Sequence, residues 1–208
     1  MSIQLEPRSR LDRDGRREAI LDAAAEVFLE QGFAASSMNE IAARVGGSKG
    51  TLYNYFKSKE ALFAAYIARH CAFQQRAMDD LLASGGDIRD VLDAVGRTYL
   101  EISVAPFGLR NFVLVVSEAW RAPEIGRAFY DAGPRRGLEK LAAFMAQASA
   151  DGRLKPCDPE VAAAQFVALC QNRLLKACLT NARPSPTAEE IADEVAAAVK
   201  TFLAAFGV

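Results

Sequence analysis

The 208-residue sequence contains one histidine, His70, and four cysteines that are spread along the chain without a C-x-x-C pair. It also lacks a glycine-rich phosphate loop and a cluster of carboxylates. A single histidine leaves at most one Ser-His-Asp or Cys-His arrangement and argues against a His-rich metal site. These absences predict a protein that is not an enzyme and that uses neither a metal nor a cofactor.

Long hydrophobic runs are missing as well. The longest apolar stretches, such as 112–116, are far too short to cross a bilayer. The first residues carry five arginines up to Arg17 instead of the apolar core of a signal peptide. Together with the dispersed cysteines, these features predict a reduced, cytoplasmic protein without a membrane partner.

An excess of basic charge is absent too, because the net charge is −1. The basic residues are nevertheless concentrated in two segments, 7–17 and 44–59, and the second of these contains no acid. Local patches are what a phosphate backbone attracts, so this distribution is compatible with nucleic-acid binding. From charge alone, a solvated protein face is an equally good interpretation.

The period-two alternation of strands is also absent, whereas apolar residues recur at helical spacing nearly everywhere. We therefore expect an all-α fold of roughly nine or ten helices. The expected helices cover about 16–31, 37–45, 48–56, 58–83, 87–105, 107–122, 135–150, 159–181 and 187–206, with a short piece after Pro123. Residues 1–57 are expected to form a three-helix N-terminal domain with a basic arm, and residues 58–208 a larger helical domain.

Within the N-terminal domain, two short helices are joined by a glycine turn. Ser37 and Glu40 form a capping-box pattern, Gly46 and Gly47 make the turn, and Ser48 is the cap of the next helix. This arrangement is the pattern of a helix-turn-helix. Taken alone the pattern is weak, since many all-helical proteins hold such a pair as plain packing.

The helix after this turn has an unusual outer face. When Leu52 faces inward, Gly50 and Asn54 face outward, and Thr51 and Tyr53 flank them. A small, polar face suits a helix that enters the major groove, where donors and a methyl group must approach base edges. A polar surface helix without a partner would have a similar face.

Lys59 follows Ser58, which looks like the start of the next helix, although a cation is disfavoured at a helix N-terminus. Free N–H groups there form an anion site, so the sequence predicts that Lys59 and the helix start bind a phosphate together. Tyr55 lies just before this site. The alternative is a tolerated surface lysine.

The segment 20–63 resembles the DNA-binding domain of the TetR family of transcriptional regulators. The matching residues are Ile20-Leu21-Asp22-Ala23-Ala24, Phe28, Gly32-Phe33, Ser36-Ser37-Met38, Ile41-Ala42, Val45-Gly46, Ser48-Lys49-Gly50-Thr51-Leu52-Tyr53, Tyr55-Phe56 and Lys59-Glu60-Ala61-Leu62-Phe63. Residues 128–166 resemble the C-terminal domain of AefR-like members. The resemblance implies a helix-turn-helix domain followed by a ligand-binding and dimerisation domain, and a homodimer that binds double-stranded operator DNA with palindromic symmetry.

The same resemblance implies which residues contact DNA. The expected contacts, including Arg16 of the basic arm and Gly50 of the recognition helix, are Arg16, Ser36, Ser37, Lys49, Gly50, Thr51, Tyr53, Asn54, Tyr55 and Lys59. Position 54 varies within the family, so Asn54 is a candidate for tuning operator specificity.

The resemblance also implies that the last two helices pair with their copies as a four-helix bundle. Two apolar stripes suit that role: Ala162, Phe166, Leu169, Cys170 and Leu174 on one helix, and Ile191, Val195, Ala198, Val199 and Phe202 on the other. A monomer could use the same stripes as ordinary core.

The central helices are expected to bind a small-molecule inducer. The candidate pocket residues are Phe73, Tyr99, Phe112, Trp120 and Phe129. Aromatic residues at helical spacing are more often core than pocket lining, so this assignment stays open. His70 is expected to be a satisfied helix residue, and Cys170 and Cys178 to be buried, inert thiols rather than redox sensors.

The favoured function is a ligand-responsive transcriptional regulator. Within this class we expect a repressor that is released from its operator by a small, mostly apolar molecule. Two alternatives remain: a helical sensor or binding protein without DNA recognition, and a transcriptional activator of the same fold.

Overall fold

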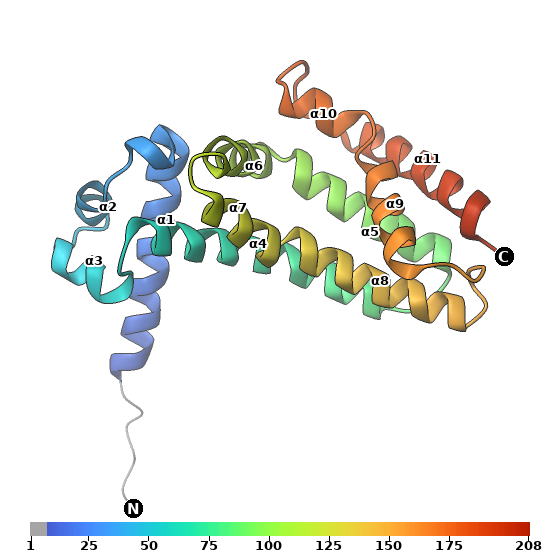
Figure 1. The fold of residues 1–208 in the computed structure, drawn as a ribbon, viewed down its shortest axis with the longest axis horizontal. Helices are drawn as coiled ribbons and strands as arrows, with labels where there is room; N and C mark the ends of the chain where they lie inside the picture. The colour runs from blue at the N-terminus through green and yellow to red at the C-terminus, as the bar shows by residue number, and fades with distance from the viewer. Residues whose placement is uncertain (1–7) are drawn as a thin grey trace, which may run out of the picture. The chain divides into compact units, whose positions relative to one another are not determined.

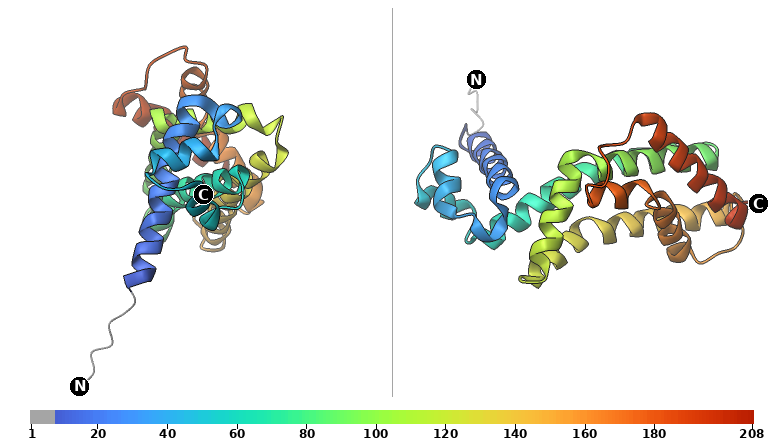
Figure 2. Two further views of the ribbon diagram at one scale, coloured as in Figure 1. Left: turned by 90° about the vertical axis from the view of Figure 1, so that its left-hand side faces the viewer. Right: turned by 90° about the horizontal axis from the view of Figure 1, so that it is seen from above.

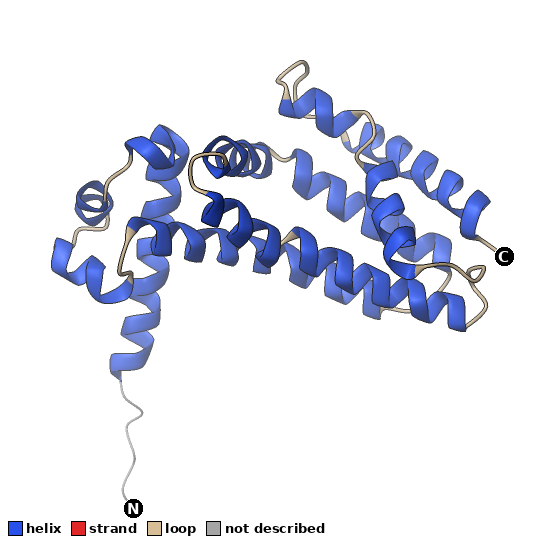
Figure 3. Ribbon diagram, in the orientation of Figure 1, coloured by secondary structure: helices blue, strands red, loops and turns tan. Residues whose placement is uncertain are grey.

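The structure, a computed structural model, describes residues 8–208, and side chains from Arg13 onward. In this range helices joined by loops and turns make up the chain, which contains one isolated bridge between Leu154 and Gly207 and no strand (Figure 3). The expected all-α fold is therefore confirmed. The helices, labelled in Figure 1, are α1 (Arg8–Ala35), α2 (Met38–Arg44), α3 (Lys49–Tyr55), α4 (Lys59–Ala83), α5 (Ile88–Val104), α6 (Pro106–Ala119), α7 (Pro123–Ala132), α8 (Pro134–Ala150), α9 (Pro159–Cys170), α10 (Leu174–Leu179) and α11 (Ala188–Phe206).

The first helix is longer than the sequence pattern indicates. α1 begins at Arg8, so the basic segment predicted as an arm is helical from that residue on, and residues 1–7 lie outside the described part of the chain. At the other end, Gly32 adopts a φ of 82° and a ψ of 167°, which interrupts α1 before its last residues. Gly32 thus ends the regular helix where predicted, because a residue without a Cβ tolerates this conformation.

The predicted helix over 159–181 is wrong in one respect, since it breaks into α9 and α10. The carboxylate of Glu194 on α11 is only 3% exposed and accepts the backbone N–H of Arg173 at 2.8 Å. The same carboxylate accepts Nε of Arg173 at 2.7 Å. The backbone N–H at the break therefore donates to a side chain on α11. The spacing of apolar residues in the sequence does not indicate this hydrogen bond.

The chain divides into two compact units, which are described separately. The first contains residues 1–69 and 114–128, and the second contains residues 70–113 and 129–208. The predicted domain boundary at 57/58 stays a prediction. Packing divides the chain later, inside α4, and assigns residues 114–128 to the N-terminal unit.

Aromatic rings form the centre of the first unit. Phe28 packs edge-on against Phe63 with ring centroids 5.0 Å apart, and Phe33 packs against Phe63 at 5.1 Å. Ile41 of α2 and Leu52 of α3 are almost fully buried in the same unit. These contacts fix the helix-turn-helix pair on α1 and the start of α4.

The core of the second unit joins α5, α9 and α11, which lie side by side (Figure 1 and Figure 2). Both apolar stripes predicted as a dimer seam belong to this core. The buried members are Ala162, Phe166, Cys170, Leu174, Ile191, Val195, Ala198, Val199 and Phe202. The assignment of these stripes to a subunit interface is corrected accordingly, because a single chain already buries them against its own helices.

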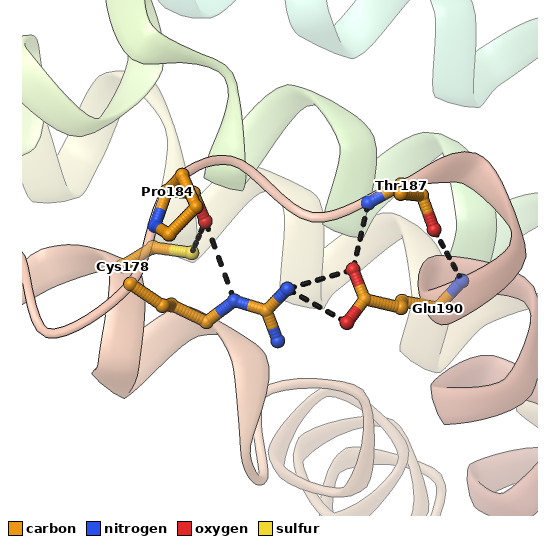
Figure 4. A network of polar contacts seen from close by, with 5 residues as sticks. Cys178, Pro184, Thr187 and Glu190 are labelled. Atoms are coloured by element: carbon orange, nitrogen blue, oxygen red, sulfur yellow. Dashed lines mark hydrogen bonds and ion pairs between the residues drawn. The ribbon is translucent and has the colours of Figure 1, made fainter.

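The segment between α10 and α11 is closed by a polar network (Figure 4). The Arg183 guanidinium donates to both carboxylate oxygens of Glu190, at 2.8 and 2.7 Å. Glu190 also accepts the backbone N–H of Thr187, whose hydroxyl accepts the N–H of Glu190 in return, so the predicted capping box is present. The hydrogen bond from Arg183 lowers the pKa of Glu190. The network fixes the N-terminus of α11.

No single helix in the described part of the chain is long and apolar enough to cross a membrane, although the bent pair α5 and α6 passes the same test by length and composition.

Gly96 marks the closest approach of α5 to its neighbours and supports a first prediction. A Cβ at this position would lie 2.7 Å from Cγ1 of Val195 and 3.3 Å from Sγ of Cys170. Gly96→Ala should therefore lower the free energy of unfolding by about 1–3 kcal/mol through overpacking. The matched control is Gly137→Ala on α8, where a Cβ would meet nothing within 4 Å, and which should raise stability by about 0.5–1 kcal/mol. Urea unfolding of both variants gives the measurement, and equal stabilisation would contradict the described packing.

Candidate nucleic-acid interface and ligand cavity

Serine caps start both helices of the helix-turn-helix. The Ser37 hydroxyl accepts the N–H of Glu40 at 3.2 Å, and the Ser48 hydroxyl accepts the N–H of Thr51 at 3.1 Å. The predicted capping box at Ser37 is only half formed, because the Glu40 carboxylate instead accepts a hydrogen bond from Gln31. Each cap satisfies N–H groups that have no partner within the helix.

The turn between α2 and α3 is held by Arg16. Its guanidinium donates to the carbonyl of Gly46 at 3.4 Å, and a Cβ on Gly47 would lie 2.6 Å from Nη2 of the arginine. Gly46 itself has a φ of 68°, which favours glycine. The structure places Arg16 against this turn, and its expected contact with DNA stays a prediction.

The outer face of α3 agrees with the helical projection. Leu52 is 1% exposed and faces the core. The outward face is formed by the exposed residues Lys49, Gly50, Tyr53 and Asn54, with Thr51 and Tyr55 half-buried beside them. The Lys49 ammonium lies 5.8 Å from the centre of the Tyr53 ring, so the cation and the aromatic ring share one surface.

Lys59 and Ser36 make internal contacts that the sequence did not indicate, and their expected contacts with DNA stay predictions. The Lys59 ammonium donates to the carbonyls of Phe33 at 2.6 Å and Ser36 at 2.9 Å, and to that of Ala34 at 3.3 Å. It also lies 4.3 Å from the centre of the Phe33 ring. The Ser36 side chain is buried and its hydroxyl donates to the carbonyl of Phe33. Both residues thus hold the junction between α1 and α2, because a cation is favourable beside the carbonyls at the end of a helix.

Part of the basic charge seen in the sequence is neutralised within the protein. Arg44 forms two 2.8 Å bonds with the carboxylate of Glu30 and a longer contact with Glu26, and this pairing raises the pKa of Arg44. The acids lie on α1, one helix away. Arg44 and Glu30 are fourteen residues apart in the sequence, so no local pattern predicts their pairing, which depends on the packing of α2 against α1.

The second unit contains a cavity of about 590 Å³. Three of the predicted pocket residues, Tyr99, Phe112 and Phe129, line it. Phe73 and Trp120 do not, and their side chains are 72% and 90% exposed, so their assignment to the pocket is wrong. Phe73 lies on an exposed face of α4 and Trp120 in the turn that follows α6, and the spacing of aromatic residues alone does not reveal either exposure.

The cavity wall also contains polar residues that the pattern of aromatic residues in the sequence does not indicate. Gln171 donates a side-chain hydrogen bond to the hydroxyl of Tyr99, and Gln75 donates to the carbonyls of Ala132 and Gly133. Burial raises the pKa of the Tyr99 phenol, which therefore remains protonated near neutral pH. A glutamine at the end of an apolar stripe, as Gln171 is, is the signal that could have indicated this polar position.

Two thiols also line the cavity, Cys71 and Cys170. Burial raises the pKa of Cys71 to about 11 and that of Cys170 to about 12. Since the thiolate is the reactive form, the raised pKa disfavours reaction of both groups near neutral pH, and for Cys170 this agrees with the expectation from the sequence.

Two family profiles match the chain. The profile of bacterial regulatory proteins of the tetR family covers residues 20–66, and that of the AefR-like transcriptional repressor C-terminal domain covers residues 90–208. The chain belongs to the TetR family. Its AefR-like C-terminal part is longer than the segment 128–166 on which the resemblance was first noted.

Solved structures of TetR-family proteins share the fold over nearly the whole chain. A TetR-family transcriptional regulator from Mesorhizobium loti MAFF303099 is 25% identical, with a TM-score of 0.86 over 98% of this chain and 100% of that one. The Flavonoid-responsive Regulator FrrA is 36% identical, with a TM-score of 0.79 over 93% of this chain and 98% of that one.

Curated HTH-type regulators match about half of the chain. The transcriptional activator FasR from Mycolicibacterium smegmatis is 50% identical over 93 residues, which are 45% of this chain and 42% of FasR. The transcriptional regulator UidR from Escherichia coli K12 is 36% identical over 110 residues, 52% of this chain and 54% of UidR. The chain thus spans about half the length of these relatives.

Proposed function

We propose that this protein is a ligand-responsive transcriptional repressor that binds a palindromic operator as a homodimer. In this proposal a small, mostly apolar molecule in the cavity releases it from DNA. The observation that carries the proposal is the exposed face of α3, with Lys49, Gly50, Tyr53 and Asn54, on a helix fixed by its caps and by Leu52. A regulator of this kind acts on the chromosome, so the proposal includes a cytoplasmic location.

The chemistry of α3 suits the major groove. Gly50 permits a close approach of the helix, and Asn54 offers both a donor and an acceptor to a base edge. Thr51 contributes a methyl group, and Lys49 and Tyr53 supply donors next to it. Ser37, at the exposed start of α2, and the half-buried Tyr55 are proposed to contact the phosphate backbone.

A dimer is proposed because two copies of one short helix read two half-sites of a palindrome. Since the predicted stripes are used inside the chain, the interface must come from other residues. The outer faces of α9 and α11 are candidates, because they carry exposed small and apolar residues such as Val161, Ala164, Ala168 and Ala197.

A cavity of this size suits a drug-sized ligand with a largely apolar surface. The name of FrrA, a flavonoid-responsive relative, supports a small-molecule effector for this chain too. If the ligand lowers operator affinity, the operator must lower ligand affinity by the same factor, because the two equilibria are linked.

Activation is the second candidate function, because the relative FasR is a transcriptional activator. A reporter placed behind the bound promoter separates the two. Deletion of the gene raises expression from a repressed promoter and lowers it from an activated one.

The test of DNA recognition uses an operator selected from random DNA by the full-length protein. Lys49→Ala, Tyr53→Phe and Asn54→Ala should each cost about 1–3 kcal/mol per half-site on the selected sequence and much less on random DNA. The matched control is Lys155→Ala, an exposed lysine of the second unit, which should leave both affinities unchanged. Fluorescence anisotropy across a salt series gives the affinities. A helical sensor without DNA recognition would select no sequence, and that result would reject the proposal.

A further inference from the structure

One side-chain hydrogen bond crosses the wall of the cavity between distant parts of the second unit. The amide of Gln171, at the end of α9, donates to the hydroxyl of Tyr99 on α5. Both residues line the cavity. The pair therefore presents an amide and a phenol, which together donate and accept hydrogen bonds, on a mostly apolar surface.

The backbone around Gln171 is anchored from two sides. Its own N–H bonds to the carbonyl of Val167 at 3.1 Å, which closes the last turn of α9. Two residues later the buried Glu194 accepts the N–H of Arg173 at 2.8 Å. Because both ends of this short segment are fixed, the Gln171 amide has a defined position in the wall.

Other polar groups of the wall are already bonded to the protein itself. Gln75 donates to two backbone carbonyls, Asn111 donates to the carbonyl of Phe107 at 2.8 Å, and Gln74 bonds with His70 at 3.0 Å. A ligand gains little by displacing a side chain from a carbonyl that would then lose its donor. The Tyr99–Gln171 pair differs from Gln75 and Asn111, because both of its partners are side chains, and from Gln74–His70, because its partners come from distant parts of the chain, so a ligand hydroxyl can insert between them and bond to both.

The charges of the wall are unsuited to an ionic ligand. Lys140 forms an ion pair with Asp79, and Lys176 is exposed to solvent. The described residues that line the cavity include no aspartate or glutamate, so a cationic ligand would find no counter-charge. The cations of the wall are Lys140, which is already paired, and the solvent-exposed Lys176, so burying an anion beside Tyr99 would be costly.

Aromatic rings supply much of the apolar surface. Phe112 and Phe129 meet at 64° with ring centroids 5.9 Å apart, and the buried Phe166 also lines the cavity. Edges and faces presented at such angles favour a further aromatic ring through offset or edge-to-face contacts.

We propose that the cavity binds an uncharged aromatic molecule that carries a hydroxyl group, and that Tyr99 and Gln171 are the residues that select for this hydroxyl. This inference rests on the proposed function, since it specifies the ligand of the same regulator. The hydroxyl inserts between the two side chains, accepts from the Gln171 amide and donates to the Tyr99 oxygen, so that neither side chain loses its partner.

The test compares three compounds with one scaffold: biphenyl, para-hydroxybiphenyl and biphenyl-para-carboxylate. Isothermal titration calorimetry with the full-length protein should give an affinity for para-hydroxybiphenyl about tenfold higher than for the other two, as one well-formed buried hydrogen bond implies. Tyr99→Phe and Gln171→Leu should each remove most of this preference while biphenyl binds as before. The matched control is Tyr130→Phe, an exposed tyrosine outside the cavity wall, which should keep the preference.

Three results would overturn the inference: tightest binding of the carboxylate, no binding of the hydroxylated compound, or an unchanged preference in the folded Tyr99→Phe and Gln171→Leu variants. Circular dichroism establishes the folding of both variants. Operator affinity is measured separately in the presence of each compound. Binding with the expected preference but without an effect on operator affinity supports the assigned hydroxyl site and contradicts the proposed regulation.

Discussion

Replacing Lys59 with alanine is expected to weaken binding to operator and random DNA together, by about tenfold or more, without changing the salt dependence of either. The ammonium holds the carbonyls of Phe33, Ala34 and Ser36. Loss of a charged donor to several carbonyls costs about 2–3 kcal/mol. The cost falls on the junction between α1 and α2, so a smaller fraction of molecules presents α3 correctly, and the apparent affinity falls by that fraction. The slope of log K against log salt stays the same because no phosphate contact is lost.

The matched comparison for this experiment is Lys57→Ala, an exposed lysine two residues away. Thermal unfolding should separate the two variants, with a lower midpoint for Lys59→Ala and an unchanged one for Lys57→Ala. Fluorescence anisotropy over a salt series measures both DNA affinities. If Lys59→Ala instead reduces the slope by about one per subunit at unchanged stability, then Lys59 contacts a phosphate, as its place in the sequence suggests.

Ala198→Glu is expected to leave the chain largely unfolded at room temperature. Ala198 is 4% exposed and belongs to the core between α5, α9 and α11. A carboxylate there either remains charged without a partner or takes up a proton, and in both cases the side chain also overpacks the site. The combined cost of several kcal/mol is comparable to the whole stability of an ordinary domain, about 5–15 kcal/mol.

Ala146→Glu is the matched control, because Ala146 is exposed on α8 and a charge there stays hydrated. Far-ultraviolet circular dichroism and thermal melts should show a native helix content for Ala146→Glu and a large loss for Ala198→Glu. Light scattering tests the alternative role of this position. A folded Ala198→Glu variant that has changed only from dimer to monomer would show that the stripe forms a subunit interface after all.

Local signals made the helix-turn-helix predictable. Ser37 and Ser48 satisfy the N–H groups of the helices that follow them, and Gly46 adopts the positive φ that favours glycine. Each of these effects acts within about four residues, so the sequence contains both partners. The outward face of α3 followed for the same reason, since a helix of known start and a buried Leu52 define the direction of every other side chain.

Sequence predicted the cavity residues only in part. Tyr99, Phe112 and Phe129 line the cavity, whereas Phe73 on α4 and Trp120 in the turn after α6 are exposed to solvent, although all five are aromatic. The hydrophobicity of a residue indicates that burial of its side chain is favourable. The packing of the neighbouring helices decides whether there is space to bury it. The polar pair Tyr99 and Gln171 arises from residues separated by 72 positions, and no local rule connects them.

By itself, then, the sequence determined the helical fold, the capped helix-turn-helix, the exposed face of α3 and the family. These depend on periodicity and on contacts within one or two turns. Only the tertiary structure decided that Lys59 serves the carbonyls of the α1–α2 junction, that Arg44 pairs with Glu30, that Glu194 takes the N–H at the break between α9 and α10, and that Ala198 lies in the core of one chain. A charged or apolar side chain interacts with whichever groups the packing of the helices brings close to it. In these cases the partner lies on another helix, many residues away in the sequence, so that local sequence patterns do not identify it.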